Sequence, residues 1–275
     1  MAGSAEEEGM KPVSGRDFSR RAVLGGTIAA VPVSAAAWAA ERKAEGGKDA
    51  CTGSPLSLRS ANNRLPHIDP GKTALVVVDL QVGFVEPGAP FALAAARHLP
   101  DVAMQMAPAV RAAGGKVVWT RHGYAAEGSS AIPAWQYEWN PAVDRLRRTF
   151  VPGTAAHALD RRIAPAADDL VVDKFRYSAF APHSSDLHDR LQRAGVDTLA
   201  IMGCATHTCC ESTARDGYAL GYKIIMLTDA NAAPSEVETM ASLHNLGIVC
   251  ADLRTVSEFS GAMRSGGAWP AAPAA

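Results

Sequence analysis

Continuous hydrophobic runs alternate with amphipathic stretches along most of the chain. Thr73–Asp79 is nearly all apolar and rich in valine, and Asp169–Lys174 repeats the pattern. Such runs are typical of strands that are buried on both faces, as in a parallel sheet between helices. Similar reasoning predicts strands at 116–120, 197–202, 222–227 and 247–251, and helices at 98–113, 184–194, 208–220 and 235–245. This order predicts an α/β fold: a single three-layer domain with a mainly parallel sheet and helices on both faces.

Three chemically useful side chains follow predicted strands. Asp79 and Lys174 end their runs, and Cys209 lies in the first turn of the helix after the strand 197–202. Free N–H groups and the positive end of the helix dipole favour a thiolate at such a position. Ligands bind at the carboxyl ends of parallel strands, so these residues are expected at one edge of the sheet. A carboxylate, a cation and a thiol together suit an activated nucleophile. The alternatives are a surface ion pair between Asp79 and Lys174, and a packing role for Cys209.

Three motifs resemble the isochorismatase-like cysteine hydrolases, a family that includes N-carbamoylsarcosine amidase, ureidoacrylate amidohydrolase, biuret hydrolase and nicotinamidase. They are Val76–Phe84, Asp173–Phe180 and Gly203–Asp216, and the similarity runs from about Ile68 to Met263. The resemblance implies that Asp79, Lys174 and Cys209 form the catalytic triad. It also implies a cis peptide bond between Cys204 and Ala205, and an oxyanion hole made by the backbone N–H groups of Ala205 and Cys209.

The same resemblance narrows the reaction. Isochorismatases proper cleave a vinyl ether and lack the nucleophilic cysteine, so Cys209 favours hydrolysis of an amide, ureide or carbamoyl C–N bond through a thioester. Nicotinamidases carry a metal site with an aspartate and histidines after the second strand. Here Trp119–Tyr124 holds one histidine and no Asp-x-His, so neither a metal nor another cofactor is expected. The alternatives are vinyl-ether cleavage at this site and a non-catalytic binding or redox protein on the same fold.

The expected substrate is a small amide or ureide, and several polar and aromatic residues near the motifs are candidates for binding it. Arg176 would suit a substrate carboxylate through a bidentate pair. A histidine base is the alternative to Asp79, and His122, which could reach the pocket from the end of its strand, is expected to contact substrate. The long connection 121–168 could help to form the wall of the pocket. The full set of tentative specificity residues is Gln81, Phe84, His122, Trp135, Arg176 and Tyr177.

The two ends of the chain differ in composition from the centre. Residues 1–40 combine paired arginines, an apolar stretch and an Ala-x-Ala site, as in a twin-arginine signal peptide, which predicts export to the periplasm or the extracellular space. Residues 41–66 are expected to be a flexible linker, 67–263 the hydrolase domain and 264–275 a disordered tail.

Composition limits the possible partners. The chain has 27 Lys and Arg against 28 Asp and Glu, a formal net charge of −1, which argues against nucleic acid and against an anionic membrane surface after processing. The five cysteines are an odd number, so at least one thiol is free in an exported protein. Cys210 and Cys250 are expected in the core. The family resemblance implies a homo-oligomer, a dimer or a tetramer.

Overall fold

Six strands form one parallel sheet in the computed structural model, which describes residues 64–270. Along the sheet their order is β3-β2-β1-β4-β5-β6. The central strands β1 and β4 are buried over their whole length, which explains why their sequences are almost continuously apolar. The strands are β1 (Thr73–Val78), β2 (Lys116–His122), β3 (Leu170–Lys174), β4 (Thr198–Cys204), β5 (Lys223–Ala232) and β6 (Ala251–Arg254).

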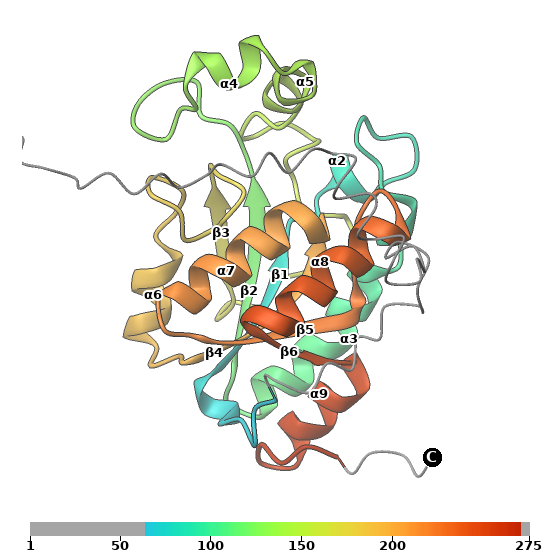
Figure 1. Cartoon of the computed structure of the whole chain (residues 1–275), viewed down its shortest axis with the longest axis vertical. Helices are drawn as coiled ribbons and strands as arrows, with labels where there is room; N and C mark the ends of the chain where they lie inside the picture. Colours follow the sequence, from blue (N-terminus) through green and yellow to red (C-terminus); the bar gives the residue numbers. More distant parts are fainter. Residues whose placement is uncertain (1–63, 271–275) are drawn as a thin grey trace, which may run out of the picture. The chain divides into compact units, whose positions relative to one another are not determined.

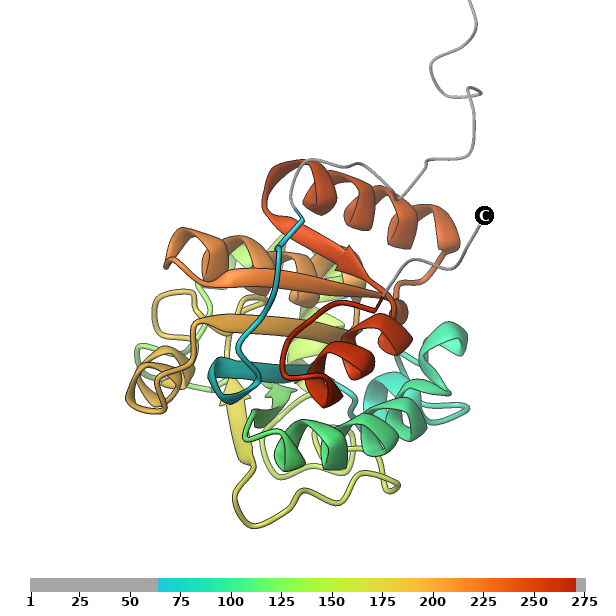
Figure 2. The same cartoon turned by 90° about the horizontal axis from the view of Figure 1, so that it is seen from below.

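Helices cover both faces of the sheet, as Figures 1 and 2 show. One face carries α6 (Leu187–Arg193), α7 (Glu211–Ala219) and α8 (Glu236–Val249), and the other carries α3 (Leu99–Ala112) and α9 (Val256–Arg264). Successive strand residues point to opposite faces, so Leu75 and Val77 join one apolar cluster and Val76 and Val78 the other. The predicted three-layer α/β fold is therefore confirmed.

The connection between β2 and β3 contains short helices of its own. Helices α4 (Ala134–Glu138) and α5 (Pro141–Thr149) lie beyond the carboxyl ends of the strands (Figure 1). Asn140 caps α5, since its side chain accepts a hydrogen bond from the Ala142 N–H. The remaining short elements are η2 (Pro70–Lys72), α2 (Val82–Val85) and η3 (Ala94–Ala96).

The strand predicted at 247–251 was wrong. Helix α8 continues to Val249, with Leu243 and Leu246 buried against the sheet, and β6 begins only at Ala251. The apolar pair Ile248 and Val249 that suggested a strand is about half exposed at the end of this helix. A short apolar run does not distinguish a strand from the last turn of a helix.

Two further differences lie after β5. This strand runs to Ala232, and Asp229 therefore lies within it, where its carboxylate accepts a hydrogen bond from the Val256 N–H at 2.8 Å. Asp229 thus has a structural role, because it joins β5 to the start of α9. Helix α9 was not predicted, although Thr255 and Glu258 form a capping box at its start.

The folded domain extends past both of its expected boundaries. The Leu65 N–H donates to the Asp252 carboxylate, and the Trp269 indole donates to the Leu65 carbonyl oxygen at 2.7 Å. The Arg254 guanidinium lies 4.0 Å from the centre of the Trp269 ring. Trp269 is therefore held against the folded domain, although it lies in the segment that was expected to be a tail. The predicted signal peptide and most of the predicted linker lie outside the described residues. No helix between residues 64 and 270 is long and apolar enough to span a membrane.

Candidate active site

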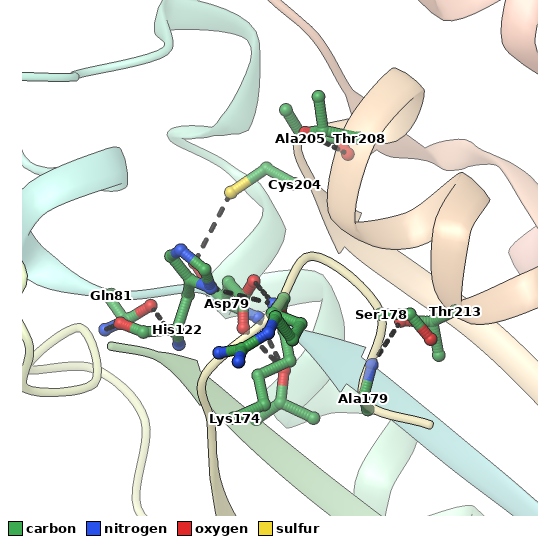
Figure 3. Close-up of polar contacts among 12 residues, drawn as sticks. Asp79, Gln81, His122, Lys174, Ser178, Ala179, Cys204, Ala205, Thr208 and Thr213 are labelled. Carbon is green, nitrogen blue, oxygen red and sulfur yellow. Dashed lines mark hydrogen bonds and ion pairs between the residues drawn. The ribbon is translucent and has the colours of Figure 1, made fainter. Parts of the chain in front are cut away.

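Asp79 directly follows β1 and is fixed by its neighbours. Its φ of 53° lies in the left-handed region, which aspartate adopts more readily than most residues. Thr120 accepts a hydrogen bond from the Asp79 N–H and donates one of 2.6 Å to its Oδ1. The Cys204 thiol donates to the Asp79 carbonyl oxygen (Figure 3). The carboxylate is therefore held in one orientation in a fully buried position.

Lys174, the last residue of β3, places a buried cation beside this carboxylate. Its Nζ lies 2.8 Å from Asp79 Oδ2, and both side chains are fully buried. Lys174 Nζ also donates to the Arg176 carbonyl oxygen and lies 3.2 Å from His122 Nδ1. Burial alone would lower the pKa of Lys174, but the charges of Asp79 and Cys209 and the hydrogen bonds to them together outweigh it, so the pKa is raised. Lys174 therefore carries its positive charge beside Asp79 at neutral pH.

His122, at the end of β2, is neutral in this environment. Burial and the nearby Lys174 ammonium hold its pKa well below the ordinary value. Because Lys174 donates to Nδ1, the imidazole hydrogen resides on Nε2. This Nε2 is buried and has no hydrogen-bond partner among the described residues. His122 is consequently a poor candidate for the base that deprotonates Cys209, and it retains an unused donor.

Cys209 lies on a π-helical turn, η4 (Thr206–Cys210), that leads into α7. The Cys210 N–H donates to the Ala205 carbonyl oxygen at 3.3 Å, five residues back, and the preceding Cys204–Ala205 peptide bond is cis. One oxygen of Asp79, one ring nitrogen of His122 and the Cys209 sulfur all lie within 4.8 Å of one another. The structure thus brings together the three residues that the sequence singled out, with His122 beside them.

The protonation state of Cys209 differs from the sequence-based expectation. Burial raises the pKa of its thiol to about 12, although the Lys174 charge acts in the opposite direction. A position near a helix start predicted a thiolate, but that argument took no account of burial or of the neighbouring Asp79 charge. The resting residue is therefore a neutral thiol, and the reaction has to remove its proton. Cys204, Cys210 and Cys250 are also buried, free thiols.

Alkylation by iodoacetamide should reveal this raised pKa. We expect the rate at Cys209 to rise with pH from 7 to 10 without levelling off, because only the thiolate reacts. Peptide mass spectrometry would separate Cys209 from the other thiols. A free cysteine, whose rate levels off above its ordinary pKa of about 8.5, provides the reference. A plateau for Cys209 between pH 6 and 8 would show a resting thiolate and contradict the prediction.

Three residues of the cluster have side chains that can ligate a metal ion. Asp79, His122 and Cys209 are of suitable types and lie close together. However, the Lys174 ammonium contacts Asp79 at 2.8 Å and His122 at 3.2 Å, so a cation already occupies the position between two of the three. The donor set therefore does not fit a metal ion in this arrangement.

A cavity of about 550 Å³ adjoins this cluster through His122, which lines the cavity and lies within 4.8 Å of Asp79 and Cys209. Four of the six tentative specificity residues line it, namely His122, Trp135, Arg176 and Tyr177. The Tyr124 and Tyr177 phenols border both the cavity and Cys209. Burial, and also the charge that Cys209 carries as a thiolate, raise the pKa of both phenols. The cavity is therefore the natural approach to the thiol.

Two of the candidate specificity residues do not line this cavity. The Gln81 amide donates to the His122 and His157 carbonyl oxygens and accepts from the His122 N–H, so all of these bonds go to the backbone. Phe84 stacks on Phe150, with 4.2 Å between ring centres, inside the core. Both residues hold the loop after β1 in place, and the expected role in substrate binding was wrong for them.

Arg176 borders the cavity, but its guanidinium is already engaged. Nη1 donates to the carbonyl oxygens of Ser130 and Phe175 at 2.6 and 2.7 Å, and Nη2 donates to those of Ser129 and Ala131. Arg176 therefore ties the loop before α4 to the end of β3. It is not free to form the bidentate pair with a substrate carboxylate that the sequence suggested.

Several residues at the site were not predicted. Thr120 is a buried threonine within a strand, and nothing in the sequence marks it as the partner of Asp79. Tyr124 comes two residues after His122, at the strand end, so its position was a usable signal. Trp139 lies in the aromatic-rich connection that the sequence proposed as a wall, and its side chain lines the cavity.

Comparisons with known proteins agree with one another. A family model for an isochorismatase domain matches residues 73–258. The ureidoacrylate amidohydrolase RutB of Methylorubrum extorquens AM1 is 33% identical over 213 residues, covering 72% of this chain and 85% of that protein. The crystal structure of a cysteine hydrolase from Pseudomonas syringae pv. phaseolicola matches with a TM-score of 0.66 and 30% identity, covering 78% of this chain and 99% of that one. N-carbamoylsarcosine amidase from Thermoplasma acidophilum shares the fold, with a TM-score of 0.56 and 24% identity, over 68% of this chain and 98% of that one.

Proposed function

Because the chain belongs to the isochorismatase family of hydrolases, we propose that it hydrolyses a C–N bond of a small molecule through Cys209. The observation that carries this proposal is the buried cluster of Asp79, Lys174 and Cys209 beside an open cavity. The motif-based resemblance is confirmed by the family match. The ureidoacrylate amidohydrolases among the relatives support an amide or ureide as the scissile group.

In the proposed mechanism, Asp79 is the base. Oδ1 accepts a hydrogen bond from Thr120 and Oδ2 contacts the Lys174 ammonium, and a remaining lone pair of this carboxylate takes the thiol proton from Cys209. The sulfur attacks the substrate carbonyl carbon and forms a tetrahedral oxyanion. When the C–N bond breaks, Asp79 gives the proton to the leaving nitrogen and an acyl thioester remains. Water then attacks the thioester, loses its proton to Asp79, and Asp79 returns a proton to the Cys209 sulfur.

Lys174 and the backbone stabilise charge in this scheme. The Lys174 ammonium contacts the Asp79 carboxylate, so a positive charge lies beside the proposed base before the proton transfer. We assign the oxyanion to the N–H groups of Ala205, which directly follows β4, and of Cys209, which lies on the π-helical turn. Loss of a single such donor typically lowers kcat by a factor of about 100 to 1,000.

The proposal is tested by trapping the thioester. The wild-type protein would be mixed with a panel of amides, ureides and biuret, ammonia release measured, and the reaction quenched in acid for mass spectrometry. We expect an acyl group on the Cys209 peptide with any substrate that turns over. Turnover without an adduct, retained in Cys209→Ala, would instead indicate chemistry that does not use the thiol, such as vinyl-ether cleavage.

Two further parts of the proposal concern the whole protein. We propose export by the twin-arginine route, on the basis of the Arg20-Arg21 pair and the apolar stretch after it. Cell fractionation, with Arg20 and Arg21 replaced by lysine as a control, tests this. We also propose a dimer or tetramer, which light scattering of the purified protein would measure.

A further inference from the structure

The cavity wall near Cys209 has exposed aromatic side chains and no unpaired cation among the described residues. We propose that its substrate is an uncharged amide or ureide that carries a flat aromatic group, which binds against Trp135 and Tyr177. This inference rests on the proposed C–N hydrolysis and specifies the part of the substrate that is not cleaved.

The first argument is the absence of a free positive charge in the cavity wall. Of the described residues that line it, only Arg176 and Arg215 are cationic at neutral pH. Arg176 donates to four backbone carbonyl oxygens, and Arg215 donates through Nε and Nη2 to Glu211 at 2.9 and 2.8 Å. The wall also contains Asp216, a carboxylate. A substrate carboxylate that bound here would therefore be desolvated without forming an ion pair with a free cation, which is unfavourable.

The second argument is the aromatic surface. Trp135 is 60% exposed, Trp139 69% and Tyr177 40%, and all three side chains line the cavity. Aromatic rings provide large apolar area and favour stacked or edge-on contact with another ring. A ring bound here would cover surfaces that the chain itself leaves open to water.

The third argument is size. A water molecule takes up roughly 30 Å³, so a cavity of about 550 Å³ holds the equivalent of roughly eighteen waters. Ligand pockets of about 300–1,000 Å³ suit molecules much larger than a short ureide.

His122, which lines the cavity, offers an unpaired Nε2–H to a substrate acceptor close to the reacting carbonyl.

Binding to the Cys209→Ala protein, which cannot form the thioester, tests the inference. Calorimetry would compare phenylurea with methylurea, which lacks the ring, and with ureidoacetate, which replaces the ring by a charge. We expect phenylurea to bind at least tenfold more tightly than either. Adding Trp135→Ala should weaken phenylurea binding about tenfold. Adding Tyr218→Ala, an equally exposed aromatic outside this cavity, should leave it unchanged.

Equal affinity for phenylurea and methylurea would overturn the aromatic part, and tighter binding of ureidoacetate would overturn the charge part. Unchanged phenylurea binding in Trp135→Ala would show that the ring does not bind against Trp135, which also contradicts the inference. The proposed function fails separately: it fails if the wild-type protein releases no ammonia from any of the panel compounds while phenylurea still binds.

Discussion

Replacing Asp79 by asparagine is expected to lower kcat about a thousandfold and to lower the free energy of unfolding by about 3–5 kcal/mol. Asparagine keeps the size of the side chain and tolerates the left-handed φ of 53°. It cannot accept the thiol proton, and it leaves the buried Lys174 ammonium without a counter-charge. Chemical denaturation and steady-state ammonia release would measure the two effects on the same protein.

Two further variants separate the loss of charge balance from the loss of the base. Asp79→Asn combined with Lys174→Met removes both buried charges, so much of the stability should return. Its activity should not, because the base is still missing. Cys209→Ala should lose activity to a similar extent while keeping near-wild-type stability, since it removes neither charge. Recovery of activity in the double variant would show that Asp79 is not the base.

Replacing Gly203 by alanine is expected to destabilise the protein by roughly 4 kcal/mol or more, and to lower activity in whatever protein still folds. Gly203 has φ +127° and pairs with Val78 across the β1–β4 ladder. A Cβ at this position would overlap the Val78 carbonyl oxygen and would lie 2.8 Å from the Val78 nitrogen. The strands would have to separate next to Asp79. Thermal unfolding, followed by ammonia release at a temperature where the variant is folded, measures both effects.

Gly195→Ala is the matched control for this variant. Gly195 also has a positive φ, +69°, but a Cβ there has no atom within 4 Å. It should therefore cost only about 1 kcal/mol, from backbone conformation alone, and leave activity intact. Equal destabilisation by the two substitutions would show that the close approach of β4 to Val78 is unimportant.

The sheet and its functional edge could be predicted because they depend on local sequence. Valine-rich runs such as Val76–Val78 are buried on both faces, and the polar residues at their ends mark the carboxyl edge. The two errors in the C-terminal part have local causes as well. The apolar pair Ile248 and Val249 fits a strand or a helix end, and the capping box of α9 was a signal that was present but not used.

The site could be predicted only in part, because some of its properties depend on contacts between distant segments. Arg176 meets carbonyl oxygens 45 to 47 residues away, so its engagement could not be derived from the sequence. The thiol pKa of Cys209 depends on how deeply its turn is buried, which a sequence argument about helix starts does not include. Gln81 has a polar side chain that could bind a substrate, but its amide already forms hydrogen bonds with three backbone groups.

The connection between β2 and β3 contributes seven of the sixteen residues around the cavity, among them Tyr124, Trp135 and Trp139, but none of the triad. Asp79, Lys174 and Cys209 instead come from the sheet edge and the turn before α7. Part of the cavity wall is therefore encoded in a stretch of the gene that contains none of the proposed catalytic residues. Natural variation within residues 123–169 can change which substrate binds while the reaction stays the same. Differences in substrate specificity between related proteins should therefore be sought first in this segment. It is also the segment to exchange when the enzyme is to be redirected toward a new compound.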